Sequence, residues 1–160
     1  MVKIIVGDRV GKLGHLTVGC SAAVFDYTTK KILLARRNDN DKWCVPGGYM
    51  EAGENFSEGC AREVLEETGL RVQVTKLIGI YTTPHRLLEY ADGNRWQLVV
   101  LHFEAEVQDG EIRTSDETSD LKFFSPSETT DLQMSDLDRR RVQDSFANRS
   151  TAFIHNDFTL

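Results

Sequence analysis

Residues 48–70 read GYMEAGENFSEGCAREVLEETGL, and this stretch decides which fold the chain adopts. Asn55 is a good N-cap residue, and Glu58 follows three positions later, as in a capping box. Gly69 stands where a helix commonly ends. Between the two ends, five apolar side chains recur at helical spacing: Phe56, Cys60, Ala61, Val64 and Leu65. The pattern predicts an amphipathic helix over residues 55–68.

The expected helix carries acidic residues where local stability disfavours them. At about 100° per residue, Glu63, Glu66 and Glu67 fall within an arc of roughly 100° beside the apolar stripe. Glu63 repels the other two, which lie in the last turn, where the helix dipole disfavours negative charge. Each conflict costs about 0.3–1 kcal/mol, and Arg62 offsets only part of it. A solvated helix face is the simpler explanation, but a hard cation such as Mg²⁺ or Mn²⁺ would turn this repulsion into binding.

Zinc is a less suitable metal for this chain. Cys20, Cys44 and Cys60 show no paired spacing, and the four histidines form no HxH or HExxH pattern. An odd number of cysteines suits a reducing compartment, and we expect all three to be packing residues.

The same stretch fills every fixed position of the signature G-x5-E-x7-R-E-U-x-E-E-x-G-U, where U is a bulky aliphatic residue. On these residues the chain resembles the Nudix hydrolases, a family that includes MutT-like proteins. The matching residues are Gly48, Glu54, Arg62, Glu63, Val64, Glu66, Glu67, Gly69 and Leu70. The preceding WCVPGG at residues 43–48 and the flanking strands extend the resemblance to about residues 15–132. It implies Mg²⁺-assisted attack of water on a nucleoside diphosphate linked to another group.

The resemblance also implies roles for individual residues. Glu63 and Glu67 are the first expected metal ligands, and the carbonyl of Gly47 is an expected backbone ligand. Glu66 is either a further ligand or the base that orients the attacking water. Arg62 is expected to orient the carboxylates.

Three more acids receive weaker assignments. Glu54 is expected to brace the loop or to hold a metal-bound water. Relatives often supply a glutamate from a loop before the last core strand, and Glu117 precedes the apolar run 121–124. Glu117 is therefore a candidate catalytic residue and metal ligand, although it also reads as a solvated acid within TSDETSD. Glu128, after Pro126, is a weaker candidate.

Length and charge restrict the possible functions. The 160 residues, 40% of them hydrophobic, suit one domain, 1–160. With 19 Lys and Arg against 25 Asp and Glu, the net charge of −6 repels a polyphosphate, so bound cations must mediate the attraction. The only basic run, residues 139–141, lies among aspartates and reads as a mixed-charge helix face. Nucleic acid is therefore not an expected partner.

The sequence also allows expectations about the cellular location and the partners of the protein. No apolar run approaches 18 residues, and the start MVKIIVGDRV has no secretory signal pattern, so we expect a cytoplasmic protein without a membrane partner. The expected partner is a small-molecule nucleotide. The sequence leaves open whether the chain forms a homodimer.

The remaining pattern predicts an α/β fold. Strands are expected over residues 17–25, 31–35, 71–81, 96–107 and 121–124, with turns at 26–30 and at Asp92–Gly93. Helices are expected over 125–132 and 135–147, the second with a capping box from Ser135 to Asp138. Together with the carboxylate helix, these elements suit the Nudix-type α/β/α sandwich with a mixed β-sheet.

Residues outside the signature are expected to set the substrate. The candidates are Tyr81, His85, Arg86, Tyr90, Trp96 and Gln97. A Tyr or Trp at strand spacing is more often a core residue, and residues 83–86 also read as a loop. Arg36 and Arg37, at a strand end, either reach a terminal phosphate or are solvated edge charges.

The leading hypothesis is a Mg²⁺-dependent pyrophosphohydrolase of small nucleotides, acting on a nucleoside triphosphate or on a nucleotide sugar such as ADP-ribose. One alternative is removal of pyrophosphate from the 5′ end of RNA, which the acidic composition disfavours. Another is a non-catalytic nucleotide-sensing domain, which the complete set of signature carboxylates disfavours.

Overall fold

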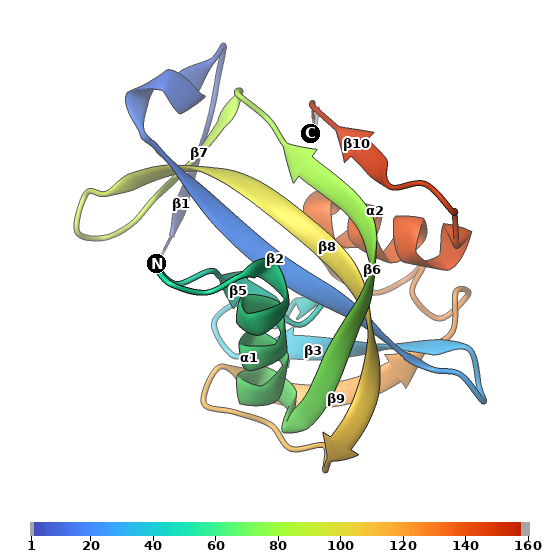
Figure 1. Cartoon of the computed structure of the whole chain (residues 1–160). Coiled ribbons are helices and arrows are strands. Elements are labelled where there is room, and N and C mark those ends of the chain that lie inside the picture. Colours follow the sequence, from blue (N-terminus) through green and yellow to red (C-terminus); the bar gives the residue numbers. More distant parts are fainter. Residues whose placement is uncertain (1, 158–160) are drawn as a thin grey trace.

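The computed structural model describes residues 2–157, and Figure 1 shows the arrangement of its elements. Along the chain these are β1 (Lys3–Val6), the 3-10 helix η1 (Val10–Leu13), β2 (His15–Asp26), β3 (Lys31–Arg37), β4 (Trp43–Cys44), β5 (Gly47–Tyr49), α1 (Phe56–Thr68), β6 (Leu70–Thr82), β7 (Arg86–Glu89), β8 (Arg95–Gly110), β9 (Thr118–Phe124), α2 (Asp136–Ala147) and β10 (Phe153–His155).

The strands form a mixed sheet, as predicted. β2 runs parallel to β8, from the pair His15 and Trp96 to the pair Val24 and Ala105. β6 and β7 pair antiparallel with β8, while β10 runs parallel to β6. β5 pairs with β2, and β9 and β4 pair with β3. The long strands β2 and β8 therefore form the centre of the molecule.

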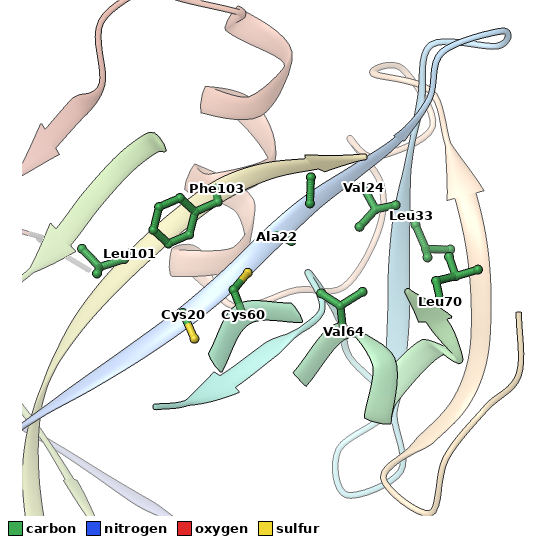
Figure 2. Close-up of a cluster of buried hydrophobic side chains, with 10 residues drawn as sticks. Cys20, Ala22, Val24, Leu33, Cys60, Val64, Leu70, Leu101 and Phe103 are labelled. Carbon is green, nitrogen blue, oxygen red and sulfur yellow. The ribbon is translucent and has the colours of Figure 1, made fainter. Parts of the chain in front are cut away.

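Both faces of the central strands are covered, which explains the apolar run in β2. Its residues 20–24 are all buried, and they alternate between two core clusters. The even-numbered residues pack with Cys60 and Val64 of α1, as Figure 2 shows, whereas Ala23 packs with Val142 of α2. The two helices lie on opposite sides of the sheet (Figure 1), so the α/β/α arrangement is confirmed.

Helix α1, which carries Glu63, Glu66 and Glu67, begins and ends where the sequence predicted. Asn55 accepts a hydrogen bond from the backbone N–H of Glu58 at 3.0 Å, and the Glu58 carboxylate accepts one from the N–H of Asn55 at 2.9 Å. Gly69 ends the helix with φ 77°, a left-handed conformation, and its N–H donates to the Leu65 carbonyl at 2.9 Å. Local sequence therefore fixes where α1 begins and ends.

The prediction of a short helix over residues 125–132 is wrong, because this segment forms consecutive turns. The Thr129 hydroxyl donates to the Pro126 carbonyl at 2.7 Å, and the Glu128 carboxylate accepts from the Ser125 N–H at 2.8 Å. Such side-chain bonds compete with helix formation. Glu128 also pairs with Lys31 at 3.2 Å, so its carboxylate connects this turn to β3.

The basic run 139–141 lies beside aspartates of α2, as expected, but only Arg140 of its three residues is exposed. Arg139 donates to backbone carbonyls of the preceding turns, including that of Leu132 at 2.7 Å. The side chain of Arg141 is only 11% exposed and donates to Ser21 Oγ at 2.8 Å and Asp138 Oδ1 at 2.6 Å. α2 itself begins as predicted, with Ser135 accepting from the Asp138 N–H at 3.1 Å. These contacts dock α2 against the sheet.

The five expected strands are present and run longer than predicted, whereas β1, β4, β5, β7 and β10 were missed. β7 begins at Arg86, inside the segment expected to be a loop. All three cysteines are free and buried, which confirms their packing role. Within residues 2–157, neither helix is long and apolar enough to cross a membrane.

Candidate active site

The last turn of α1 lies between β5 and the start of β9. The backbone N–H of Gly47 donates to Glu67 Oε2 at 2.9 Å, and the Thr118 hydroxyl donates to the Glu67 carbonyl at 3.3 Å. Glu67 is 7% exposed as a result. Three distant parts of the chain therefore meet at Glu67.

Burial and like charges act together on the carboxylates of this turn. Burial raises the pKa of Glu67 to about 7, the Gly47 hydrogen bond opposes the shift, and the charges of Glu63 and Glu117 add to it. Burial also raises the pKa of Glu63, against the lowering effect of Arg62. The repulsion expected from helical spacing is thus present between Glu63 and Glu67, and the negative charges here lack full compensation.

Arg62 connects the helix to the loop before it. Its Nε donates to Glu54 Oε1 at 2.6 Å, its Nη1 to Glu63 Oε1 at 2.8 Å and its Nη2 to the Tyr49 carbonyl at 2.9 Å. Glu54 also accepts from the Glu51 N–H at 2.9 Å. The hydrogen bonds from Arg62, and then that from Glu51, lower the pKa of Glu54 to about 2. Arg62 and Glu54 thereby hold residues 49–54 against α1.

Gly48 makes room for one of the carboxylates. A Cβ atom placed on Gly48 would lie 2.4 Å from the carboxyl carbon of Glu63, closer than any side chain permits. Gly48 pairs with Cys20 of β2, so the backbone cannot easily move away. The absence of a side chain at this position allows the Glu63 carboxylate to sit against β5.

Glu66 and Glu117 lie at the margin of this group. The Glu66 side chain is 59% exposed and lies 3.4 Å from Arg62 Nη1. The backbone carbonyl of Glu117 accepts from the Asn38 N–H at 2.9 Å, and the negative charge of Glu117 acts on both Glu63 and Glu67. The structure thus brings Glu117 to the carboxylate helix across a long stretch of sequence.

Within residues 2–157, no three acidic, histidine or cysteine side chains already surround a common point as metal ligands would. Instead, Glu67 is held by the Gly47 N–H, and Glu63 by Arg62. The donor set nevertheless fits a hard divalent cation, because carboxylate oxygens predominate, and their pKa values are raised first by burial and then by neighbouring carboxylates. Binding such an ion would require these carboxylates to turn toward it.

Two adjoining cavities form a cleft beside the carboxylates. The first, of about 190 Å³, borders Gly47, Gly48 and Tyr49 of β5. The second, of about 300 Å³, extends to Arg86 and Trp96. Five residues line both cavities: Arg37, Leu98, Val100, Leu137 and Asp138. The cleft therefore leads from the signature to β7 and β8.

The substrate candidates named from sequence divide into two groups. Tyr81, Arg86 and Trp96 line the second cavity, although the Tyr81 hydroxyl also donates to Asp144 at 2.8 Å. The remaining three do not line either cavity: His85 accepts from the backbone of Arg9, Tyr90 shares a hydrogen bond with Tyr49, and Gln97 approaches Gly11.

Of the two arginines at the end of β3, Arg37 lines both cavities and pairs with Asp39 at 2.9 Å. Arg36 pairs with Asp41 at 3.5 Å and lines neither cavity.

Several lining residues were missed by the sequence analysis. Leu98 and Val100 share one face of β8 with Trp96, and this period-two spacing was the signal that could have revealed them. Ser135, Leu137 and Asp138 come from the start of α2, far from the signature. No local pattern indicates that they reach the cleft.

The sequence matches the model of the NUDIX domain family over residues 15–145. The chain belongs to the Nudix family. The match continues past residue 132 and includes most of α2, the helix whose start lines the cleft.

Two relatives illustrate the range of names within the family. The Nudix chain is 33% identical over 103 residues to an ADP-ribose pyrophosphatase of Methanocaldococcus jannaschii, an alignment covering 63% of this chain and 57% of the relative. It is 37% identical over 101 residues to a MutT-like protein of Streptomyces ambofaciens, covering 63% and 59%. The aligned part thus spans less than three fifths of each relative's length.

Solved structures share the fold. A NUDIX hydrolase from Nitrosomonas europaea superposes with a TM-score of 0.69 at 23% identity, covering 88% of this chain and 79% of that one. An ADP-ribose pyrophosphatase from Streptococcus suis gives 0.63 at 23% identity, covering 88% and 98%. At this identity the likeness concerns the fold alone.

Proposed function

We propose that this Nudix chain hydrolyses a phosphoanhydride bond in a small nucleoside diphosphate derivative, with Mg²⁺ as its metal and Mn²⁺ as a substitute. The observation that carries the proposal is the buried Glu67, whose pKa is raised to about 7 beside Glu63 and Glu117 at one end of a cleft. Burying several carboxylates together is unfavourable unless a cation compensates them.

The metal would be held by Glu63, Glu67 and Glu117, together with the carbonyl of Gly47. When bound, Mg²⁺ would neutralise phosphate oxygens and lower the pKa of a coordinated water. Glu66 is more exposed than the other signature carboxylates, which suits either an outer ligand or a base that takes a proton from the attacking water.

Arg62 and Glu54 act through their contacts rather than on the substrate. The guanidinium holds Glu63 and the Tyr49 carbonyl at once, so it fixes the distance between α1 and the loop that follows β5. Glu54 keeps that guanidinium oriented through two bonds, at 2.6 and 3.0 Å. We therefore assign both as positioning residues.

The proposed substrate is a nucleoside triphosphate or a nucleotide sugar such as ADP-ribose. The net charge of −6 supports a small substrate attracted through bound cations rather than a nucleic acid. A relative named ADP-ribose pyrophosphatase supports the second of these two substrate groups. The three free buried cysteines support a reducing, cytoplasmic location.

The test is hydrolysis of a panel of nucleoside triphosphates and nucleotide sugars with Mg²⁺, comparing the wild type with Glu67→Gln. Glu67→Gln keeps the side-chain size and removes the charge, so we expect kcat to fall by about a hundredfold or more. Glu106→Gln, at an exposed position of β8, is the matched control and should leave kcat unchanged. Equal activity in wild type and Glu67→Gln would reject the metal assignment.

The same panel separates the alternatives. Turnover of triphosphorylated RNA with a steep salt dependence would favour RNA 5′-pyrophosphohydrolase activity. Complete inactivity combined with tight binding of one nucleotide would favour a sensing domain.

A further inference from the structure

Arg86 has an unusual environment at the far end of the cleft. It opens β7, where its backbone pairs with Val6 of β1, and it lines the cavity of about 300 Å³. Its Nε is buried and has no hydrogen-bond partner among residues 2–157. No carboxylate of that part of the chain lies within ion-pair distance of it, and burial lowers the pKa of its guanidinium.

The other two arginines of the cleft are paired. Arg37 donates twice to Asp39, at 2.9 Å each, and Arg141 donates to Asp138 at 2.6 Å. The Nε of Arg141 is also buried without a hydrogen-bond partner, but among residues 2–157 Arg86 is the one arginine of these three that has no carboxylate partner. Buried donors are nearly always satisfied, and the Nε of the partly buried Arg86 is not. The missing partner is therefore expected to be a ligand.

The cavity around Arg86 favours a flat, neutral ligand. Its wall is formed by Trp96, Leu88, Leu98 and Val100, an aromatic and aliphatic surface suited to a planar ring. Its volume of about 300 Å³ lies at the small end of ligand pockets, which suits a single base. Asp138 also lines the cavity, and the negative charges of Asp136 and Asp138 act on Arg86. Those charges would repel an anionic ligand, so a neutral group that accepts hydrogen bonds fits best.

We propose that this cavity receives the nucleobase of the substrate, and that Arg86 selects a 6-oxopurine such as guanine or hypoxanthine. The proposal rests on the proposed function. A guanidinium is a rigid fork, and the O6 and N7 atoms of a 6-oxopurine are two adjacent acceptors that it can bind together. Adenine offers N7 beside an amino group, which would point one donor at another.

The shape of the cleft agrees with this assignment. Leu98 and Val100 line both cavities, so a nucleotide with its base against Trp96 would direct its phosphates toward Gly47 and Gly48. The carboxylates of α1 lie beside these glycines. One bound molecule can therefore span both ends of the cleft.

The test measures the binding of GMP and AMP to the whole chain by calorimetry in the presence of Mg²⁺. Neither ligand contains a phosphoanhydride, so the result does not depend on hydrolysis. The variants are Arg86→Met, which removes the donors, and Arg86→Lys, which keeps the charge but loses the fork. Arg95→Met is the matched control, because Arg95 is exposed on β8, pairs with Glu89 at 2.6 Å and does not line the cavity.

We expect the wild type and Arg95→Met to bind GMP about tenfold or more tightly than AMP. The preference should disappear in Arg86→Met and be reduced in Arg86→Lys, while the melting temperature of Arg86→Met should not fall, because an unpaired buried charge is removed. Three outcomes would overturn the inference. The wild type could bind GMP and AMP with equal affinity, or Arg86→Met could keep the preference for GMP. The third outcome is that the wild type binds neither ligand at millimolar concentration. A GMP preference that depends on Arg86 in a chain without hydrolytic activity would instead reject the proposed function alone.

Discussion

The backbone N–H of Gly47 donates to the carboxylate of Glu67 at 2.9 Å and thereby joins β5 to the last turn of α1. This hydrogen bond favours the ionised carboxylate, whereas burial favours the neutral acid. Burial has the larger effect, because the pKa of Glu67 is raised to about 7. Glu67 therefore changes its charge near neutral pH as long as no cation compensates it.

The raised pKa of Glu67 predicts that the metal-free protein loses stability as pH rises. The folded state binds the proton more tightly than the unfolded chain, whose carboxyl has the ordinary value of 4.5. The contribution is therefore full below about 4.5 and is lost as pH rises through about 7. Its size is on the order of 1–3 kcal/mol.

This pH dependence is measured by urea unfolding in a chelator at pH 5 and pH 8. Because other groups titrate in the same range, the comparison is between the wild type and Glu67→Gln, which should show a smaller loss. Added Mg²⁺ should restore the wild type at pH 8 and have little effect on the variant. Parallel curves for the two proteins would contradict the prediction.

Gly48→Ala should weaken metal binding. The new methyl group would lie 2.4 Å from the Glu63 carboxyl carbon and displace it. We expect Mg²⁺ affinity to fall by about tenfold or more, measured by calorimetry, with a parallel loss of kcat/KM. Gly93→Ala is the control, because Gly93 has φ 85° in the turn between β7 and β8 and open space around it. This change should lower the free energy of unfolding by about 1 kcal/mol and leave the Mg²⁺ affinity unchanged. An unchanged Mg²⁺ affinity in Gly48→Ala would disprove the steric argument.

Arg62→Lys should impair catalysis despite keeping the charge. A lysine cannot contact Glu54, Glu63 and the Tyr49 carbonyl together as the guanidinium does. We expect kcat/KM to fall by about 10–100-fold. If Arg62 and Glu54 act as one unit, Glu54→Gln should lower kcat/KM by a similar factor. The double variant Arg62→Lys with Glu54→Gln should then be no less active than either single variant. Fully additive losses would show that the two residues act separately.

Asn55→Ala should lower stability without changing the site. Loss of the cap bond to the Glu58 N–H should cost about 1 kcal/mol in urea unfolding, whereas kcat at saturating Mg²⁺ should be unchanged because the carboxylates lie two turns away. Asn94→Ala, which removes the hydrogen bond from the Asn94 side-chain amide to Asp92 Oδ2 in an exposed turn, should cost less. A large fall in kcat for Asn55→Ala would mean that the helix start also positions the site.

The parts of the fold predicted best were those specified by neighbouring residues. α1 has the predicted cap at Asn55 and the predicted end at Gly69, and the central strands follow their alternating or continuous apolar patterns. The segment 125–132 was mispredicted because its side chains bond to its own backbone and Arg139 donates to its backbone carbonyls, which propensity does not reveal. β1 and β7 were missed because each is short and is stabilised by pairing with the other.

The sequence by itself determined the family signature, the helix that carries it and the spacing of its acids, because caps and helical periodicity depend on residues a few positions apart. Only the tertiary structure decided that Glu67 is 7% exposed while the side chain of its neighbour Glu66 is 59% exposed. It also decided that the Nε of Arg86 is buried without a hydrogen-bond partner among residues 2–157 and that the start of α2 lines the cleft. These properties depend on packing between strands and helices distant in the chain, and that packing sets both the burial of each charge and its pKa.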